Sequence, residues 1–295
     1  MTGEPQTEGA APAPVVIELD RGTPTPIELS VHPTTDTAAP AILVSPAMGM
    51  RASFYRPLLT ALAAAGVHAG VVELRGHQRR PAPSPGRRHD FGYADLAGDL
   101  AAAVVATRER WPRAAVTTLG HSFGGHVATA HVALHRGARD PARPDAVALV
   151  ATGSVGWRTW GRIGPWHLLR SQALLALTTA LGHFPGDKVG FAGREARTQM
   201  SEWARWARTG ALRVGDPVRT VDHLVADLRL PVLAVSFARD PLAPASTTDA
   251  LAGLYRAATV TRRDLDPGLE RPHFDWVRDP EPIVPLLVDW ARSRR

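Results

Sequence analysis

The sequence contains no cysteine, and this absence removes several kinds of chemistry. Disulfide bonds, a thiolate nucleophile and cysteine-ligated metal sites are all excluded. Lysine is nearly absent too, because Lys188 is the only one among 34 lysines and arginines. The arginines form no stripe along one helix, so we expect no nucleic-acid partner. Together with abundant Ala, Pro and Gly, they indicate coding bias in a GC-rich genome; a surface for anionic partners is the alternative.

Long apolar runs are also lacking. No stretch approaches about 18 consecutive apolar residues, so we expect no membrane span. Residues 1–9 carry acids and no apolar segment, which argues against a secretory signal and favours a cytoplasmic location. Residues 1–14 contain few apolar side chains and are predicted to form a disordered leader. The remaining chain is long enough for one large α/β domain with an insertion.

Apolar runs and helical patterns alternate over most of the chain. Two runs at 15–19 and 27–31, joined by a turn, predict an antiparallel hairpin. Continuous apolar runs predict buried strands at 41–44, 69–74, 115–119, 146–150 and 231–237, with a further strand at 258–261. Helical patterns lie between them at 54–65 (capped by Ser53), 95–110, 124–135, 247–254 and 281–292. This alternation predicts an α/β fold with a mostly parallel central sheet and helices on both faces.

The alternation stops between residues 153 and 228. Helical periodicity is visible at 168–177 and 194–207, and no run typical of a strand is found. Five of the eight tryptophans fall in this segment: Trp157, Trp160, Trp166, Trp203 and Trp206. We interpret the segment as a helical lid inserted into a core formed by residues 15–152 and 229–295. A helical layer packed beside the sheet without a lid role is the alternative.

A candidate nucleophile lies at the end of the strand predicted at 115–119. There the chain reads Gly-His-Ser-Phe-Gly over residues 120–124 and then enters a helix. In such a nucleophile elbow the serine is exposed on a strained turn, and a Cβ two residues before or after it would clash. Gly120 and Gly124 meet that demand, which makes Ser122 the candidate. A second segment, Gly153-Ser154-Val155-Gly156, lacks the glycine two residues before its serine.

A serine needs a general base and an acid that orients the base, and in an elbow of this kind both follow later in the chain. His273 is the only histidine beyond the last long strand, in a predicted loop before the final helix. Asp240 follows the strand at 231–237, at the carboxyl edge where catalytic groups gather. Asp266 and Asp275 are closer to His273 in sequence, but neither ends a parallel strand. The predicted catalytic residues are therefore Ser122, Asp240 and His273.

An oxyanion hole requires backbone N–H groups that face the developing negative charge. The residue after the nucleophile, Phe123, is expected to supply one. The other is expected from the loop after the strand at 41–44, where Pro46 has no N–H. Ala47 is the first choice for the second donor, and Met48 is the alternative.

The order of elbow, acid and histidine resembles the α/β-hydrolase superfamily over roughly residues 15–295. Residues 74–77, Leu-Arg-Gly-His, are similar to a turn common after the fourth strand of that fold. Further segments at 46–49, 184–186, 193–196 and 203–206 resemble a bacterial branch of hydrolases related to serine aminopeptidase-like and lysophospholipase-like enzymes. The resemblance implies a serine hydrolase with a small-molecule substrate. Gln78, in place of a second glycine, and the sequence Pro-His-Phe-Asp at 272–275 depart from the pattern.

Other polar clusters give weaker signals. His131 and His135 have the spacing of metal ligands on a helix, but no acid completes a metal motif, so we expect no metal. No dinucleotide fingerprint or phosphate loop is present, and we expect no cofactor. Arginines at 79–80 and 87–88 lie in a Pro-rich loop, where they would hold an anionic group or be solvated.

The sequence thus predicts hydrolysis of an ester or thioester through an acyl-enzyme. The Trp-rich insertion favours a substrate with a hydrophobic portion. Acyl transfer to an acceptor other than water would use the same residues. Cleavage of amide or carbon–carbon bonds is also open, because the fold hosts many chemistries. A non-catalytic binding protein on this scaffold is the remaining alternative.

Overall fold

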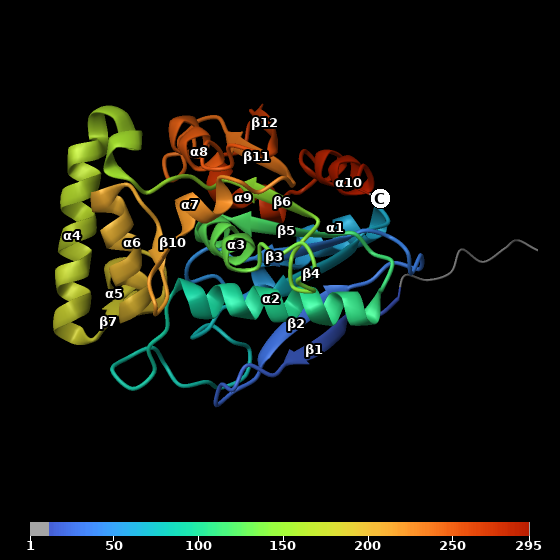
Figure 1. Cartoon of the computed structure of the whole chain (residues 1–295), viewed down its shortest axis with the longest axis horizontal. Coiled ribbons are helices and arrows are strands. Elements are labelled where there is room, and N and C mark those ends of the chain that lie inside the picture. The colour runs from blue at the N-terminus through green and yellow to red at the C-terminus, as the bar shows by residue number, and fades with distance from the viewer. Residues whose placement is uncertain (1–11, 295) are drawn as a thin grey trace, which may run out of the picture.

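The computed structural model describes residues 12–294 as a central sheet covered by helices on both faces (Figure 1). Most of the leader predicted at 1–14 lies outside the described residues. The sheet order is β1-β2-β4-β3-β5-β6-β11-β12. Its strands are β1 (Val15–Leu19), β2 (Ile27–His32), β3 (Ala41–Ser45), β4 (His68–Val72), β5 (Val116–His121), β6 (Ala146–Val150), β11 (Pro231–Phe237) and β12 (Thr259–Leu265). Each strand predicted from the sequence is found, with ends shifted by a few residues.

The strand directions explain where the candidate residues gather. β1 pairs with β2, and β2 with β4, in antiparallel register. The other strands of this sheet, β3, β5, β6, β11 and β12, run parallel to β4 and to one another. β3, β5, β6 and β11 therefore end at the same edge of the sheet, so the segments that follow them meet there. The predicted hairpin and the mostly parallel sheet are both confirmed.

Two apolar cores lie on opposite faces of the sheet. One face is covered by α2 (Tyr93–Arg110), α3 (Phe123–Leu134), α7 (Val221–Val225) and α8 (Ala245–Ala252). The other is covered by η1 (Ala52–Tyr55), α1 (Arg56–Ala64), α9 (Pro272–Arg278) and α10 (Val284–Arg292). The continuous apolar strands are required by this arrangement, because every side chain of β3 to β6 is buried.

Two local predictions in the core were wrong. The helix expected from residue 54 begins as the 3-10 turn η1, and α1 starts at Arg56 with Pro57 in its first turn. Ser53 lies inside η1 and does not cap the helix; no side chain caps α1. His273, expected in a loop, lies in the short helix α9, where Pro272 occupies the first helical position.

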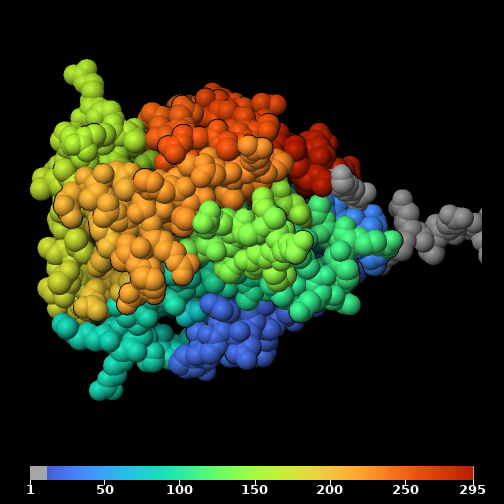
Figure 2. All heavy atoms as spheres, viewed as in Figure 1, coloured from blue at the N-terminus to red at the C-terminus, as the bar shows by residue number. Residues whose placement is uncertain are grey.

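Most of the segment between β6 and β11 forms a separate layer at one end of the molecule, the left end in Figures 1 and 2. It contains η2 (Trp157–Ile163), α4 (Gly164–Leu181), β7 (His183–Pro185), α5 (Gly186–Val189), β8 (Arg194–Ala196), α6 (Arg197–Thr209), β9 (Arg213–Val214) and β10 (Arg219–Thr220). We call residues 157–220 the cap layer. The expectation of no strands here was wrong, because β7–β8 and β9–β10 form two small antiparallel pairs. These strands are two or three residues long, too short for an alternating pattern to be visible.

Polar contacts attach α6 of the cap layer to the core loop that precedes α2. Asp90 accepts hydrogen bonds from the backbone N–H (2.8 Å) and the hydroxyl (2.8 Å) of Thr198 in the first turn of α6. The buried Glu202 accepts from the N–H of Tyr93 at 2.7 Å. These bonds satisfy helix-terminal N–H groups that have no partner within their helices, so they fix α6 relative to α2.

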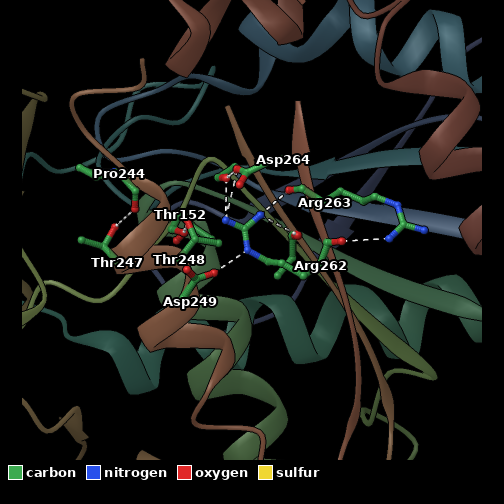
Figure 3. A network of polar contacts seen from close by, with 10 residues as sticks. Thr152, Pro244, Thr247, Thr248, Asp249, Arg262, Arg263 and Asp264 are labelled. Carbon is green, nitrogen blue, oxygen red and sulfur yellow. Dashed lines mark hydrogen bonds and ion pairs between the residues drawn. The ribbon is translucent and has the colours of Figure 1, made fainter. Parts of the chain in front are cut away.

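The last strand of the sheet is held by an arginine network (Figure 3). Arg262 on β12 donates to Asp249 of α8 at 2.7 Å and to the hydroxyl of Ser236 on β11 at 2.7 Å. On the same helix, Thr248 donates to the backbone oxygen of Thr152, just after β6, at 2.8 Å. α8 thereby links the edge of the sheet to the segment beside the elbow. The charged side chains on β12 also discourage pairing with another sheet edge.

Among residues 12–294, no helix is both long and apolar enough to span a membrane. No group of three His, Asp or Glu side chains in that range could hold a metal ion. His131 donates through Nε2 to the carbonyl of Ala142 at 2.9 Å, and His135 pairs with Asp140 at 2.9 Å.

His131 makes stability depend on pH. Burial, with a further effect from His135, lowers its pKa from 6.5 to about 3. Between pH 3 and pH 6.5, His131 is therefore protonated in the unfolded chain and neutral in the folded chain. The free energy of unfolding consequently falls as the pH decreases below about 6.5. The contribution approaches about 1.4 kcal/mol per pH unit. His131→Gln keeps an N–H donor for Ala142 but cannot titrate, and we expect a shallower slope between pH 6.5 and pH 4.5.

Urea unfolding at several pH values measures that slope. His89→Gln is the matched control, because His89 is exposed, and it should behave as wild type. A slope in His131→Gln equal to that of the wild type would contradict the assignment.

Candidate active site

The turn after β5 holds Ser122 in a conformation that few residues adopt. Its backbone has φ 54° and ψ −120°, and the residue stands directly before α3. Such values cost of order 1–3 kcal/mol, so the surrounding structure must impose them. The Ser122 N–H donates to the carbonyl of Val150 on β6, and its carbonyl accepts from the Thr152 hydroxyl at 2.5 Å. Both partners belong to the neighbouring strand and its continuation, which anchor the turn.

Close packing around the turn requires the two glycines predicted from the sequence. A Cβ on Gly120 would lie 2.3 Å from Cα of Gly125. A Cβ on Gly124 would lie 1.9 Å from the carbonyl oxygen of Ser45 on β3. Neither contact is sterically possible, so both positions exclude larger residues in this geometry.

The three side chains named from the sequence are in direct contact. Ser122 Oγ lies 2.9 Å from Nε2 of His273, and Nδ1 of the same imidazole lies 2.8 Å from Asp240 Oδ2. His273 and Asp240 are both about 4% exposed. A carboxylate only accepts hydrogen bonds, so Nδ1–H donates to Asp240 and the lone pair of Nε2 faces the serine hydroxyl. The fold thus brings together the segments that follow β5, β11 and β12. Ser122 and His273 are 151 residues apart in the sequence.

Backbone N–H groups hold the carboxylate of Asp240 in place. Its Oδ1 accepts from Leu242 N at 2.9 Å and from Ala243 N at 3.1 Å, which leaves Oδ2 for His273. The other candidate acids are used elsewhere. Asp266 is exposed and pairs with Arg239 at 3.3 Å, and Asp275 binds the backbone and guanidinium of Arg271.

The loop after β3 lies beside the serine. The N–H of Ala47, the first choice for an oxyanion donor, already donates to the buried hydroxyl of Tyr55 at 2.8 Å. Within residues 12–294, the N–H groups of Met48 and Phe123 bond to no other group. Phe123 is the first residue of α3, so its N–H has no intrahelical acceptor. The pair with free donors at this site is therefore Met48 and Phe123, not Ala47 and Phe123.

Sequence reasoning missed a buried chain of hydrogen bonds behind the site. His121 Nε2 donates to the carbonyl of His273 at 2.8 Å, and Tyr55 donates to His121 Nδ1 at 2.8 Å while accepting from Ala47. Burial, and then the neighbouring His273, lower the pKa of His121 well below 6.5, so the imidazole is neutral and donates only through Nε2. Burial likewise raises the pKa of Tyr55. The chain connects the loop after β3 to the backbone of the histidine that contacts Ser122.

A cavity of about 500 Å³ opens in front of Ser122. The core contributes Met48, Phe123 and His273 to its lining, and the cap layer contributes aromatic and apolar side chains, including Trp160, Trp166, Leu174, Phe191 and Trp203. This volume is typical of a small-molecule site. The cap layer therefore forms the wall opposite the serine.

His126, which also lines this cavity, joins the cap layer to the elbow helix. Its Nε2 donates to the carbonyl of Gly153 at 2.9 Å, and its ring meets Trp206 of α6 edge-on, with centroids 4.7 Å apart. Burial lowers the pKa of His126 to about 4, so the imidazole is neutral near pH 7. In the loop that follows β4, Arg79 and Arg80 pair with Glu28, whereas Arg87 donates to the carbonyl of Ala180 in α4 of the cap layer at 3.1 Å.

The turn after β4 departs from the expected glycine pattern without losing its hydrogen bonds. Gln78 accepts from the N–H of Gly76 through its side chain at 2.8 Å, which supports the turn. His77 Nε2 lies 3.1 Å from the buried Glu195 of β8, a contact between core and cap layer.

Comparison with known proteins places the chain in a family. Residues 36–189 match the family described as serine aminopeptidase, S33. A protein of Variovorax paradoxus named "Putative carbamate hydrolase RutD" is 31% identical over 246 residues, which cover 83% of this chain and 79% of that protein. The chain belongs to the S33 family of α/β hydrolases. It is therefore an enzyme of the hydrolase class, as the sequence predicted.

Solved structures agree on the fold of this hydrolase. A thermostable carboxyl esterase from Bacillus coagulans has a TM-score of 0.64 at 12% identity, covering 95% of this chain and 98% of that chain. An enol-lactonase from Burkholderia xenovorans has a TM-score of 0.56 at 18% identity, covering 94% of this chain and 99% of that chain. The α/β-hydrolase fold is confirmed by both.

Removing the Tyr55 hydroxyl tests the buried chain of hydrogen bonds. Tyr55→Phe leaves Ala47 N–H and His121 Nδ1 without partners, and we expect the free energy of unfolding to fall by about 2–4 kcal/mol. Tyr255→Phe is the control, because that buried tyrosine makes one hydrogen bond, to Thr129 at 3.0 Å. Denaturant unfolding compares the two variants. An equal loss of unfolding free energy in both would show that the hydrogen bonds of Tyr55 to Ala47 and His121 stabilise the fold no more than the single bond of Tyr255.

Proposed function

We propose that this hydrolase cleaves an ester or thioester of a small molecule through a covalent acyl-enzyme on Ser122. The observation that carries the proposal is the pair of contacts from His273, 2.9 Å to Ser122 Oγ and 2.8 Å to Asp240 Oδ2. A serine hydroxyl is a weak nucleophile unless a base removes its proton, and the imidazole is positioned to do so. Asp240 holds the ring in the tautomer that leaves Nε2 free and stabilises the imidazolium that forms.

In the first half-reaction, Ser122 Oγ attacks the carbonyl carbon while its proton passes to His273 Nε2. The tetrahedral intermediate collapses as the bond to the alcohol or thiol breaks, and the imidazolium returns the proton to that leaving group. In the second half-reaction, His273 takes a proton from water, whose oxygen attacks the acyl carbon. The acid is released and the proton returns to Ser122 Oγ, so the enzyme is regenerated.

Two backbone donors are proposed to hold the oxyanion, Phe123 N–H and Met48 N–H. Both residues line the cavity beside Ser122, and both amides are free of other hydrogen bonds within residues 12–294. Each such donor typically contributes about 100- to 1,000-fold in turnover. The bond between Ala47 N–H and Tyr55 then acts indirectly, by fixing the loop that presents Met48.

Residues 153–228 are proposed to act as a cap on the core formed by 15–152 and 229–295. The support is that side chains from this segment line the cavity opposite Ser122. Their aromatic and apolar character favours a substrate with a hydrophobic portion. Exclusion of water by such a wall would also strengthen the hydrogen bonds to the oxyanion.

Labelling with a fluorophosphonate tests the nucleophile. We expect wild type to be labelled and Ser122→Ala to remain unlabelled, because only an activated serine reacts rapidly. Ser154→Ala is the matched control: Ser154 is buried in the second Gly-Ser segment, where its hydroxyl accepts a hydrogen bond from Gly156 N–H, and its replacement should leave labelling intact. Labelling of Ser122→Ala at the wild-type rate would refute the assignment.

Substitution of the partners tests the triad. We expect His273→Ala and Asp240→Asn each to lower kcat for an aryl ester by roughly 10⁴-fold. Asp266→Asn should leave turnover unchanged, because Asp266 pairs with Arg239 on the surface. A loss of only a few-fold in either triad variant would require another base or acid.

A crystal structure of the phosphonylated enzyme tests the donors. We expect the phosphoryl oxygen to lie about 2.7–3.1 Å from the amides of both Met48 and Phe123. An oxygen bound instead to the amide of Ala47 would show that the Tyr55 bond breaks on reaction.

A further inference from the structure

One formally charged side chain lines the cavity, and it is positive. Arg170 of α4 contributes to the lining, whereas no Asp or Glu of the described residues does. Asp240 is close by, but its carboxylate is fully buried behind His273 and bound to it. The cavity therefore presents one guanidinium and no carboxylate to whatever occupies it.

The guanidinium of Arg170 is positioned by stacking and remains available. It lies over the ring of Phe191, another lining residue, 5.0 Å from the ring centroid. Within residues 12–294 it makes no ion pair and no hydrogen bond. By contrast, Arg194 on β8 donates to the carbonyl of Pro85 at 2.7 Å. Since a guanidinium carries five donors in a planar fork suited to carboxylates, Arg170 offers an unused anion-binding group.

The residues near Arg170 in the sequence add further positive charge and no negative charge. No Asp or Glu occurs between Asp145 and Asp187, a stretch that contains η2 and α4. Arg158 and Arg162 lie in the same stretch, and Arg158 stacks on Trp157 with its guanidinium 4.5 Å from the ring centroid. Three positive charges without a negative neighbour on these elements produce a positive potential at this side of the cavity, which attracts anions.

Flat aromatic rings line the same cavity as the guanidinium. The rings of Trp160 and His167 stack with centroids 4.1 Å apart and planes 9° apart, and Trp203 meets His167 at 69°. All three residues line the cavity. The combination of aromatic walls and a single cation fits an amphiphilic anion better than a neutral lipid or a cation.

We propose that the natural substrate is an ester or thioester that carries a carboxylate on its apolar or aromatic body, and that Arg170 binds this carboxylate while Ser122 attacks the ester carbonyl. This inference rests on the proposed function, because it assigns the substrate class of the same site. Arg170 binds and orients the substrate; it takes no part in bond making.

A matched series of esters tests the proposal. Methyl monoesters of straight-chain dicarboxylic acids, from succinate to sebacate, place the carboxylate at increasing distance from the ester carbonyl. The ω-amide of each monoester is the neutral isostere. We expect the wild-type enzyme to prefer the acid over the amide by about 10- to 100-fold in kcat/KM at the best length, mainly through KM.

Three variants locate the preference. In Arg170→Gln the acid and the amide of each length should be hydrolysed with equal kcat/KM, and Arg170→Lys should retain part of the preference, because the charge survives without the fork. Arg208→Gln is the control, since Arg208 is exposed on α6, outside the cavity lining and outside η2 and α4, and should keep the wild-type preference. Absence of any preference for the acids, or its persistence in Arg170→Gln, would overturn the proposal.

Labelling of Ser122 supplies the same comparison without turnover. The monoamide of the best-fitting dicarboxylic acid should protect Ser122 from the fluorophosphonate at lower concentration than the diamide does, and Arg170→Gln should remove this difference. Equal protection by the two compounds in wild type would refute the role of Arg170. Failure of Ser122 to label at all would instead refute the proposed function, so the two failures are distinguishable.

Discussion

The site depends on one constraint, the strained backbone of Ser122 between β5 and α3. The positive φ turns the hydroxyl out of the sheet toward His273, and the hydrogen bonds to Val150 and Thr152 prevent the turn from relaxing. The backbone segments around the turn pack so closely that a Cβ at Gly120 or Gly124 would clash with them. The fold thus fixes the position of the serine oxygen, and the proposed attack by Ser122 would need little reorganisation.

Behind that turn, buried polar groups connect the segments that carry the proposed catalytic residues. The chain from Ala47 through Tyr55 and His121 to the backbone of His273 crosses three segments that are far apart in sequence. Each member has the partners it needs, which is the condition under which a buried polar network rigidifies a site rather than weakening it. The positions of the proposed Met48 donor and of the proposed general base, His273, are in this way fixed relative to each other.

Much of the fold and the three contacting side chains could be predicted, because their signals are local. Buried parallel strands appear as continuous apolar runs, and the elbow needs its glycines within five consecutive residues. Interactions across the chain carry no such local signal. The bond from Ala47 N–H to Tyr55 is one of them, because nothing in the loop sequence reveals that hydroxyl. The β7–β10 strands are too short to carry a pattern, and Arg170 becomes notable only when the cavity lining is known.

The cap layer and the core together line the cavity, and the proposed chemistry depends on Ser122 in the elbow. The most direct measurement of that chemistry is rapid-quench mass spectrometry of the wild-type enzyme during turnover of a slow aryl ester. If Ser122 is the nucleophile, we expect a transient mass increase equal to the acyl group, on the peptide that contains Ser122, formed with a stoichiometric burst of the phenol. A burst with the acyl group on another residue, or steady turnover in Ser122→Ala, would contradict this role of Ser122.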